Sequence, residues 1–91
     1  MTYAWIATVE VAAGADLDQL SKQLRGEIIP ATEQAAGFQR GYWFRHATDP
    51  LRGAVVVLFD SEEAAQQASA PEGTPEVTML TRDLYEITAE A

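Results

Sequence analysis

The segment AVVVLF, residues 54–59, is apolar at all six positions. A strand with one face in water alternates apolar and polar side chains, whereas a strand covered on both faces is apolar throughout. The segment therefore predicts a central strand with other parts of the protein packed against both of its faces. This requirement limits the folds that the rest of the chain can adopt.

The flanking sequence supplies further strands and a long helix. Three more segments are rich in β-branched and aromatic residues and are predicted to be strands: residues 3–11, 38–46 and 76–88. Between the first two of them, apolar residues recur every three or four positions after Asp16, which predicts an amphipathic helix that ends at Gly37. Pro30 cannot donate a hydrogen bond to the carbonyl of Gly26, so we expect a kink or break there.

A second, shorter helix is predicted over residues 61–70, opened by a capping pair formed by Asp60 and Glu63. The order of elements is then β-α-β-β-α-β. Right-handed crossovers place the first and third strands in the middle of an antiparallel sheet. The sequence therefore predicts a single α+β, ferredoxin-like domain over residues 1–91, with a four-stranded antiparallel sheet and two helices on one face.

The second face of this sheet needs a cover that the chain does not contain. Residues 54–59 are apolar on both sides, but the two helices can cover only one side. A second copy of the chain, joined through a two-fold axis with like surfaces facing, would cover the other. The periodicity therefore predicts a homodimer.

Charge and composition restrict the partners. Acidic residues outnumber basic ones by 14 to 6, and a net charge of −8 repels nucleic acid and anionic membranes. The chain has no cysteine, no cluster with metal-ligand spacing and no phosphate-binding motif. No apolar run is long enough to span a membrane, and the first residues lack the basic start of a signal peptide. We expect a cytoplasmic protein without a metal, nucleic-acid or membrane partner.

Three stretches resemble a known family: VEVAAGADLDQL, AAGFQRGYWFR and VVVLFDSEEAAQQA. They are similar to the dimeric α+β barrel superfamily, in particular its antibiotic-biosynthesis-monooxygenase-like branch, and the resemblance covers nearly all of the chain. It implies that two sheets close into a barrel, with ligand pockets between each sheet and its helices or within the barrel. Members of the superfamily include cofactor-free monooxygenases, heme-degrading enzymes and small-molecule isomerases.

The chain departs from the heme-degrading members of that superfamily. Those members use an Asn on the first strand, a Trp where the third strand meets the second helix, and a His on that helix. This chain contains no Asn, has Phe59 near the Trp position and has no His after His46. We therefore predict no cofactor. Cofactor-free oxygenation, in which the protein positions a substrate and stabilises its anion, stays open.

The stretch GFQRGYWFRH, residues 37–46, holds three candidate ligand-binding residues. Trp43 could stack on a flat ligand and Arg45 could hold the ligand's anionic end, or Trp43 could lie in a dimer interface with Arg45 paired to an acidic residue. His46, the only histidine, could act as a general base. Alternatively, His46 could be exposed to solvent beside the hairpin loop that follows, without a catalytic role.

Two candidates lie on the first predicted strand. Trp5 could reach a ligand, or it could belong to the core. Glu10 could be a buried carboxylate with a raised pKa, or a carboxylate at the solvent end of the strand.

Regular alternation along residues 38–46 divides their side chains between the two faces of the sheet. One set is expected to face the helix-covered core: Phe38, Tyr42 and Phe44. The other set is expected to face the partner subunit or a pocket: Gln39, Trp43 and Arg45.

Two functions stay open at this point. The first is a homodimer that binds a small aromatic or hydrophobic molecule, with monooxygenase-like or isomerase-like chemistry. The second is a non-catalytic dimerisation or accessory module with no ligand pocket. A cavity beside Trp43 would favour the first, and complete burial of Trp43 between subunits would favour the second.

Overall fold

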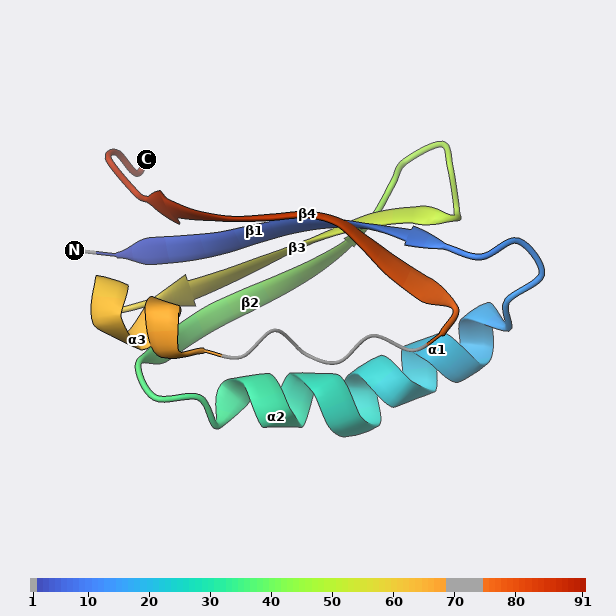
Figure 1. Cartoon of the computed structure of the whole chain (residues 1–91), viewed down its shortest axis with the longest axis horizontal. Coiled ribbons are helices and arrows are strands. Elements are labelled where there is room, and N and C mark those ends of the chain that lie inside the picture. Colours follow the sequence, from blue (N-terminus) through green and yellow to red (C-terminus); the bar gives the residue numbers. More distant parts are fainter. Residues whose placement is uncertain (1, 69–74) are drawn as a thin grey trace.

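The computed structural model describes residues 2–68 and 75–91. Its helices and strands follow in the predicted order (Figure 1): β1 (Tyr3–Val11), α1 (Leu17–Gln23), α2 (Ile29–Glu33), β2 (Phe38–Arg45), β3 (Arg52–Phe59), α3 (Glu62–Gln67) and β4 (Val77–Glu86). A π-helical segment, Leu24–Ile28, joins α1 to α2. The predicted second helix was too long at its C-terminal end, and the last part of that prediction lies outside the described residues.

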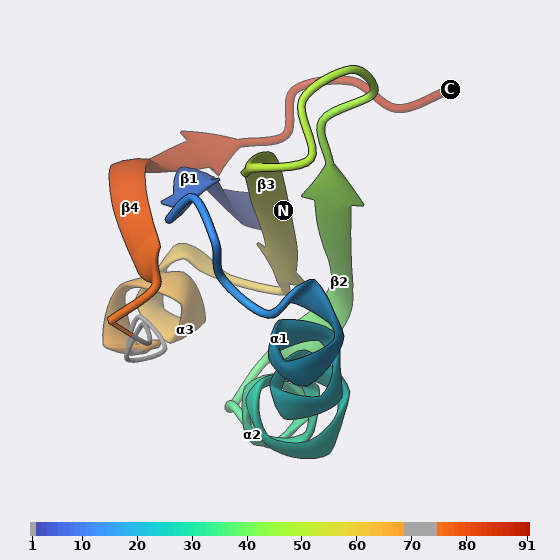
Figure 2. The ribbon, with the colours of Figure 1, turned by 90° about the vertical axis from the view of Figure 1, so that its right-hand side faces the viewer.

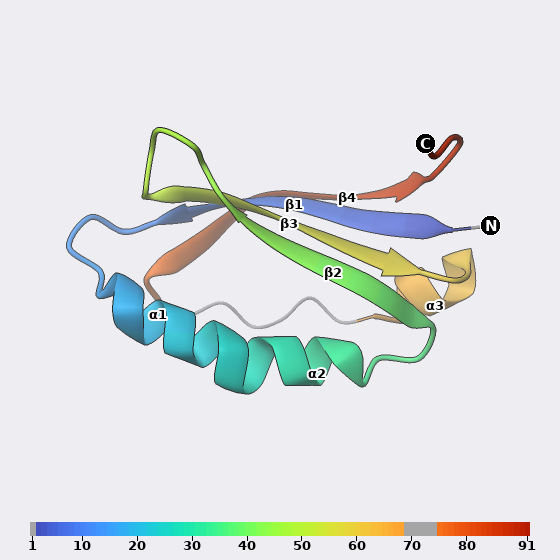
Figure 3. The ribbon, with the colours of Figure 1, turned by 180° about the vertical axis from the view of Figure 1, so that it is seen from behind.

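The four strands form one antiparallel sheet in the order β2-β3-β1-β4. The first and third strands are central, as predicted. All helices lie on one face of the sheet, and Figures 1 and 3 show this from opposite sides. The predicted α+β, ferredoxin-like fold is therefore confirmed.

The long helical region begins where the sequence predicts, but α2 ends at Glu33 with Gln34 as its C-cap, earlier than the predicted end at Gly37. The Asp16 side chain accepts a hydrogen bond from the Gln19 backbone N–H at 3.1 Å, which caps α1. Gly37 is left-handed, at φ 77°, but it lies in the turn that leads from α2 into β2. The predicted irregularity before Pro30 is present as the π-helical segment, since Pro30 has no N–H for an ordinary helical bond.

The cap of α3 differs from the prediction. The side chain of Ser61, not that of Asp60, accepts a hydrogen bond from the Ala64 backbone N–H, at 3.1 Å. Ser61 has the extended backbone of an N-cap residue and directly precedes the helix, which starts one residue later than the predicted pair requires.

The core lies between α3 and the part of the sheet against which α3 packs. Val57, Phe59 and Ala65 are buried together, and Phe59 is only 2% exposed. Ala65 is fully buried, so α3 can approach the sheet closely through its alanine side. Partly buried side chains, among them Trp5 and Phe38, pack around this cluster.

The predicted assignment of side chains to the two faces of β2 was wrong beyond its first residue. Phe38 pairs with Phe59 but Arg40 pairs with Leu58, so the strand carries one extra residue, Gln39, at a β-bulge. The bulge reverses the alternation of every residue that follows. Among the residues expected to face the core, only Phe38 does so.

After the bulge, Trp43 and Arg45 share a face with Val55 and turn toward the helices. Tyr42 and Phe44 instead lie on the face without helices, where they are 44% and 52% exposed. Their rings are stacked, with centroids 6.2 Å apart.

We call the side of the sheet without helices the open face (Figure 2). The pairing register of the strands places these apolar residues on the open face: Ala4, Ile6, Tyr42, Phe44, Val56, Leu58 and Tyr85.

No helix within the described residues is long and apolar enough to cross a membrane.

Candidate functional site

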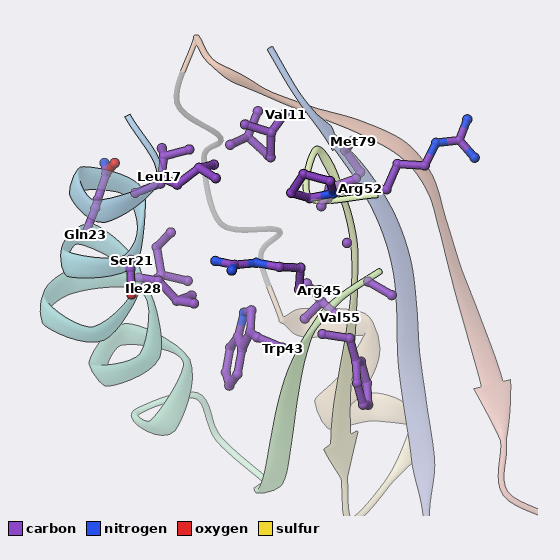
Figure 4. Close-up of a pocket in the computed structure, with 18 of the residues that line it drawn as sticks. Val11, Leu17, Ser21, Gln23, Ile28, Trp43, Arg45, Arg52, Val55 and Met79 are labelled. Carbon is purple, nitrogen blue, oxygen red and sulfur yellow. The ribbon is translucent and has the colours of Figure 1, made fainter. Parts of the chain in front are cut away.

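A cavity of about 700 Å³ lies between the sheet and the helical layer formed by α1 and the π-helical segment (Figure 4). This volume is in the range typical of small-molecule sites, roughly 300–1,000 Å³. Nine of the lining residues have aliphatic or thioether side chains: Val9, Val11, Leu17, Leu20, Leu24, Ile28, Val55, Val77 and Met79. The cavity is therefore suited to an apolar molecule.

Trp43 and Arg45 line this cavity, and both side chains point from β2 toward the helical layer (Figure 4). The indole ring of Trp43 lies over Gly41. A Cβ atom at Gly41 would come within 2.8 Å of two atoms of that ring, closer than van der Waals contact allows. Gly41 therefore leaves the space that the indole occupies, and Trp43 forms a flat, apolar part of the wall.

The cavity lacks carboxylates among the described residues that form it. Three arginines contribute to the wall: Arg25 from the π-helical segment, Arg45 from β2 and Arg52 from β3. Ser21 and Gln23 add the other polar side chains. The site is thus a mainly aliphatic chamber whose wall includes the Trp43 indole and three arginines, with Phe44 also at its border.

His46 does not line the cavity. Its Nδ1 atom accepts hydrogen bonds from the backbone N–H groups of Thr48 and Asp49, at 3.2 and 3.1 Å. These bonds fold the β2–β3 loop around the imidazole, much as an Asn or Asp side chain organises a turn. The histidine is exposed, as its alternative interpretation held, and its contacts are those of a loop-stabilising residue.

We expect His46→Ala to lower the free energy of unfolding by about 1 kcal/mol, because two backbone N–H groups lose their acceptor. His46→Asn is the matched variant, since its side-chain oxygen can accept from the same loop, and about half of the loss should be recovered. Urea denaturation of both variants measures the difference. Equal loss in the two variants would contradict a hydrogen-bonding role.

Trp5 also lies outside the cavity, in the partly buried layer around the core. Its Nε1–H donates to the Ala65 carbonyl at 2.5 Å, and the Arg82 guanidinium lies over its ring, 3.7 Å from the centroid. Arg82 donates in turn to the Ala68 carbonyl at 3.3 Å, and burial lowers the pKa of Arg82. This cluster ties α3 to β1 and β4.

Glu10 is exposed and lies on the open face near the end of β1, with Arg52 and Thr78 as its neighbours on the adjacent strands. Of the five candidates predicted from the sequence, the cavity thus brings together Trp43 and Arg45 and leaves out His46, Trp5 and Glu10.

The family resemblance implied a pocket between the sheet and its helices, but none of the five candidate residues lay on a helix. Arg25, Leu24 and Ile28 line the cavity from the π-helical segment. The sequence signal for this contribution was the position of Arg25 between Leu24 and Ile28, two residues of the apolar face of the predicted helix. Within residues 2–68 and 75–91, no group of three or more His, Asp or Glu side chains could hold a metal ion.

Neither a protein-family model nor a curated protein matches the sequence. Solved structures do. The heme-degrading protein Rv3592 (MhuD) of Mycobacterium tuberculosis, solved with two hemes in its active site, is 23% identical with a TM-score of 0.73, and the match covers 98% of each chain. The same protein in a heme-free form is 24% identical, with a TM-score of 0.71 over 100% of this chain and 99% of that one.

A putative antibiotic biosynthesis monooxygenase from Bordetella bronchiseptica is 21% identical, with a TM-score of 0.56. That match covers 69% of this chain and 62% of the Bordetella chain. At these identities the comparisons show the fold alone. They confirm that the fold resembles that of antibiotic-biosynthesis-monooxygenase-like proteins.

Proposed function

We propose that this protein is a homodimer that binds a small aromatic or hydrophobic molecule in the cavity between α1 and the sheet. The observation that carries the proposal is the cavity itself, about 700 Å³ in volume and walled by aliphatic side chains and Trp43. A flat apolar ligand would exclude water from this wall and stack against the indole. That MhuD, which has the same fold, was solved with hemes in its active site supports small-molecule binding.

Heme itself does not fit this lining. Heme iron in proteins is held by His, Cys, Met or Tyr side chains. Among the described residues of the wall, the Met79 thioether is the only such group, and the Nδ1 atom of His46 accepts hydrogen bonds from its own loop. We therefore propose a ligand site without a cofactor.

The chemistry that the wall could perform is limited. A general base must lie within hydrogen-bond reach of the proton that it removes. The described wall has no carboxylate, imidazole or phenol side chain to do so. If the protein is an enzyme of the monooxygenase-like or isomerase-like kind, it acts by positioning its substrate and stabilising negative charge. The cavity beside Trp43 favours ligand binding over a purely accessory role.

The open face supports the homodimer. Tyr42, Phe44 and Tyr85 are each 44–52% exposed there, and the described helices all lie on the opposite side (Figure 2). Exposed aromatic side chains grouped on one sheet face are typical of protein interfaces. A second copy placed face to face would cover the face symmetrically. A cytoplasmic location stays a prediction.

A matched pair of substitutions tests the ligand site. We expect the neutral probe 2-naphthamide to bind the wild-type protein in isothermal titration calorimetry. Trp43→Phe should weaken this binding about fivefold, or about 1 kcal/mol, because the smaller ring offers less stacking area. Trp5→Phe makes the same chemical change outside the cavity, so it should leave the affinity unchanged while lowering the melting temperature.

At a concentration of about 100 times its Kd, the probe should stabilise the wild-type protein by about 2.7 kcal/mol. No binding of any two-ring aromatic probe would contradict the proposed function. A loss of affinity in Trp5→Phe but not in Trp43→Phe would contradict the assignment of the site.

A further inference from the structure

We propose that the cavity selects a ligand with a carboxylate, so that the natural ligand is an aromatic or hydrophobic carboxylic acid in its ionised form. This inference rests on the proposed function and specifies the ligand class of the same site. Its basis is the distribution of charge. The chain has 14 acidic and six basic residues, yet three of the six basic residues and none of the described acidic ones line the cavity.

The three arginines are not equivalent. Arg52 turns away from the helical wall in Figure 4, and its Nε atom lies 3.9 Å from the Asp49 carboxylate. Arg45 extends into the cavity, toward the helical layer that carries Arg25. Among the described residues, no carboxylate lies within 4.0 Å of either of these two guanidinium groups.

The Arg45 guanidinium enters an otherwise mainly aliphatic chamber from β2, and Arg25, an exposed residue of the π-helical segment, contributes to the facing wall. Guanidinium presents a planar set of N–H donors that matches the two oxygens of a carboxylate. The net charge of −8 disfavours anions at long range, so any preference for an anion must arise locally at these side chains.

The lack of a base in the wall agrees with this ligand class. A carboxylic acid is already ionised at neutral pH, so it needs no proton acceptor in the protein. The ligand would place its carboxylate between Arg45 and Arg25 and its flat apolar part against Trp43 and the aliphatic wall.

Calorimetry with two isosteric probes, 2-naphthoate and 2-naphthamide, tests the inference. We expect the wild-type protein to bind the carboxylate about tenfold more tightly than the amide at low ionic strength, with a smaller ratio at high salt. The double variant Arg25→Gln/Arg45→Gln should lose this ratio but still bind 2-naphthamide. Lys22→Gln removes the same charge from an exposed position of α1 outside the cavity, so it should keep the ratio.

Each outcome separates the two proposals. Equal affinity for the two probes in the wild-type protein would overturn the carboxylate preference and leave the proposed function standing. A preference that survives in the double variant would overturn the assignment to Arg25 and Arg45. If neither probe binds, the proposed function fails and this inference fails with it.

Discussion

Replacing Gly37 with alanine should lower the free energy of unfolding by about 3 kcal/mol, a large part of the stability of a small domain. Two costs combine at this position. The backbone has φ 77°, a conformation that alanine adopts only at a cost of about 1–2 kcal/mol. An added Cβ would also lie 2.5 Å from the Cβ of Ala64 and 2.6 Å from a carboxylate oxygen of Asp60.

Gly14 offers a control that separates these two costs. It has a similar backbone conformation, φ 87°, but nothing lies within 4 Å of an added Cβ. Gly14→Ala should therefore cost only about 1 kcal/mol. Denaturation midpoints in urea, with unchanged slopes, measure both losses. Equal losses would show that the close contact of residue 37 with α3 does not add to the stability loss in Gly37→Ala.

Replacing Tyr42 with glutamate should convert the dimer to a monomer. In a two-fold interface formed by the open face, both copies of the new carboxylate would be removed from water beside Phe44 and Val56. We expect the dimer dissociation constant to rise at least about 100-fold, or about 2.7 kcal/mol. The isolated subunit should stay folded, because Tyr42 is 44% exposed in it.

Sedimentation velocity over a range of concentrations measures the change in mass. Gln19→Glu is the matched control, since it adds one negative charge at an exposed position of α1, in the helical layer. It should remain a dimer. A wild-type monomer at micromolar concentration would contradict the homodimer, and a dimeric Tyr42→Glu variant would show that a different surface forms the interface.

The fold could be predicted from the sequence because its signals are local and repeat regularly. The apolar stripe after Asp16, the left-handed Gly37 and the apolar run in β3 each depend on neighbouring residues only, and chain order then determines the sheet. Strand β1 has the same bounds as its prediction.

The candidate site was harder to predict, because its geometry depends on single irregularities. Trp43 and Arg45 were named as candidates but assigned to the wrong face, since a β-bulge has no reliable sequence signal. The role of Arg25 depends on how the helix packs over the sheet, and the space for the indole depends on the missing side chain of Gly41. Such information comes from tertiary contacts and not from periodicity.

The extra residue in β2 makes the chemistry of the cavity depend on the length of the strand as well as on its composition. Deleting Gln39 would restore regular alternation, and Tyr42 and Phe44 would then exchange places with Trp43 and Arg45. The chamber would lose Trp43 and Arg45 and gain a phenol in one step, while the open face would gain the charge of Arg45. In a fold of this kind, a one-residue insertion or deletion is therefore a direct evolutionary route between binding specificities, and it would change the ligand and the subunit interface together.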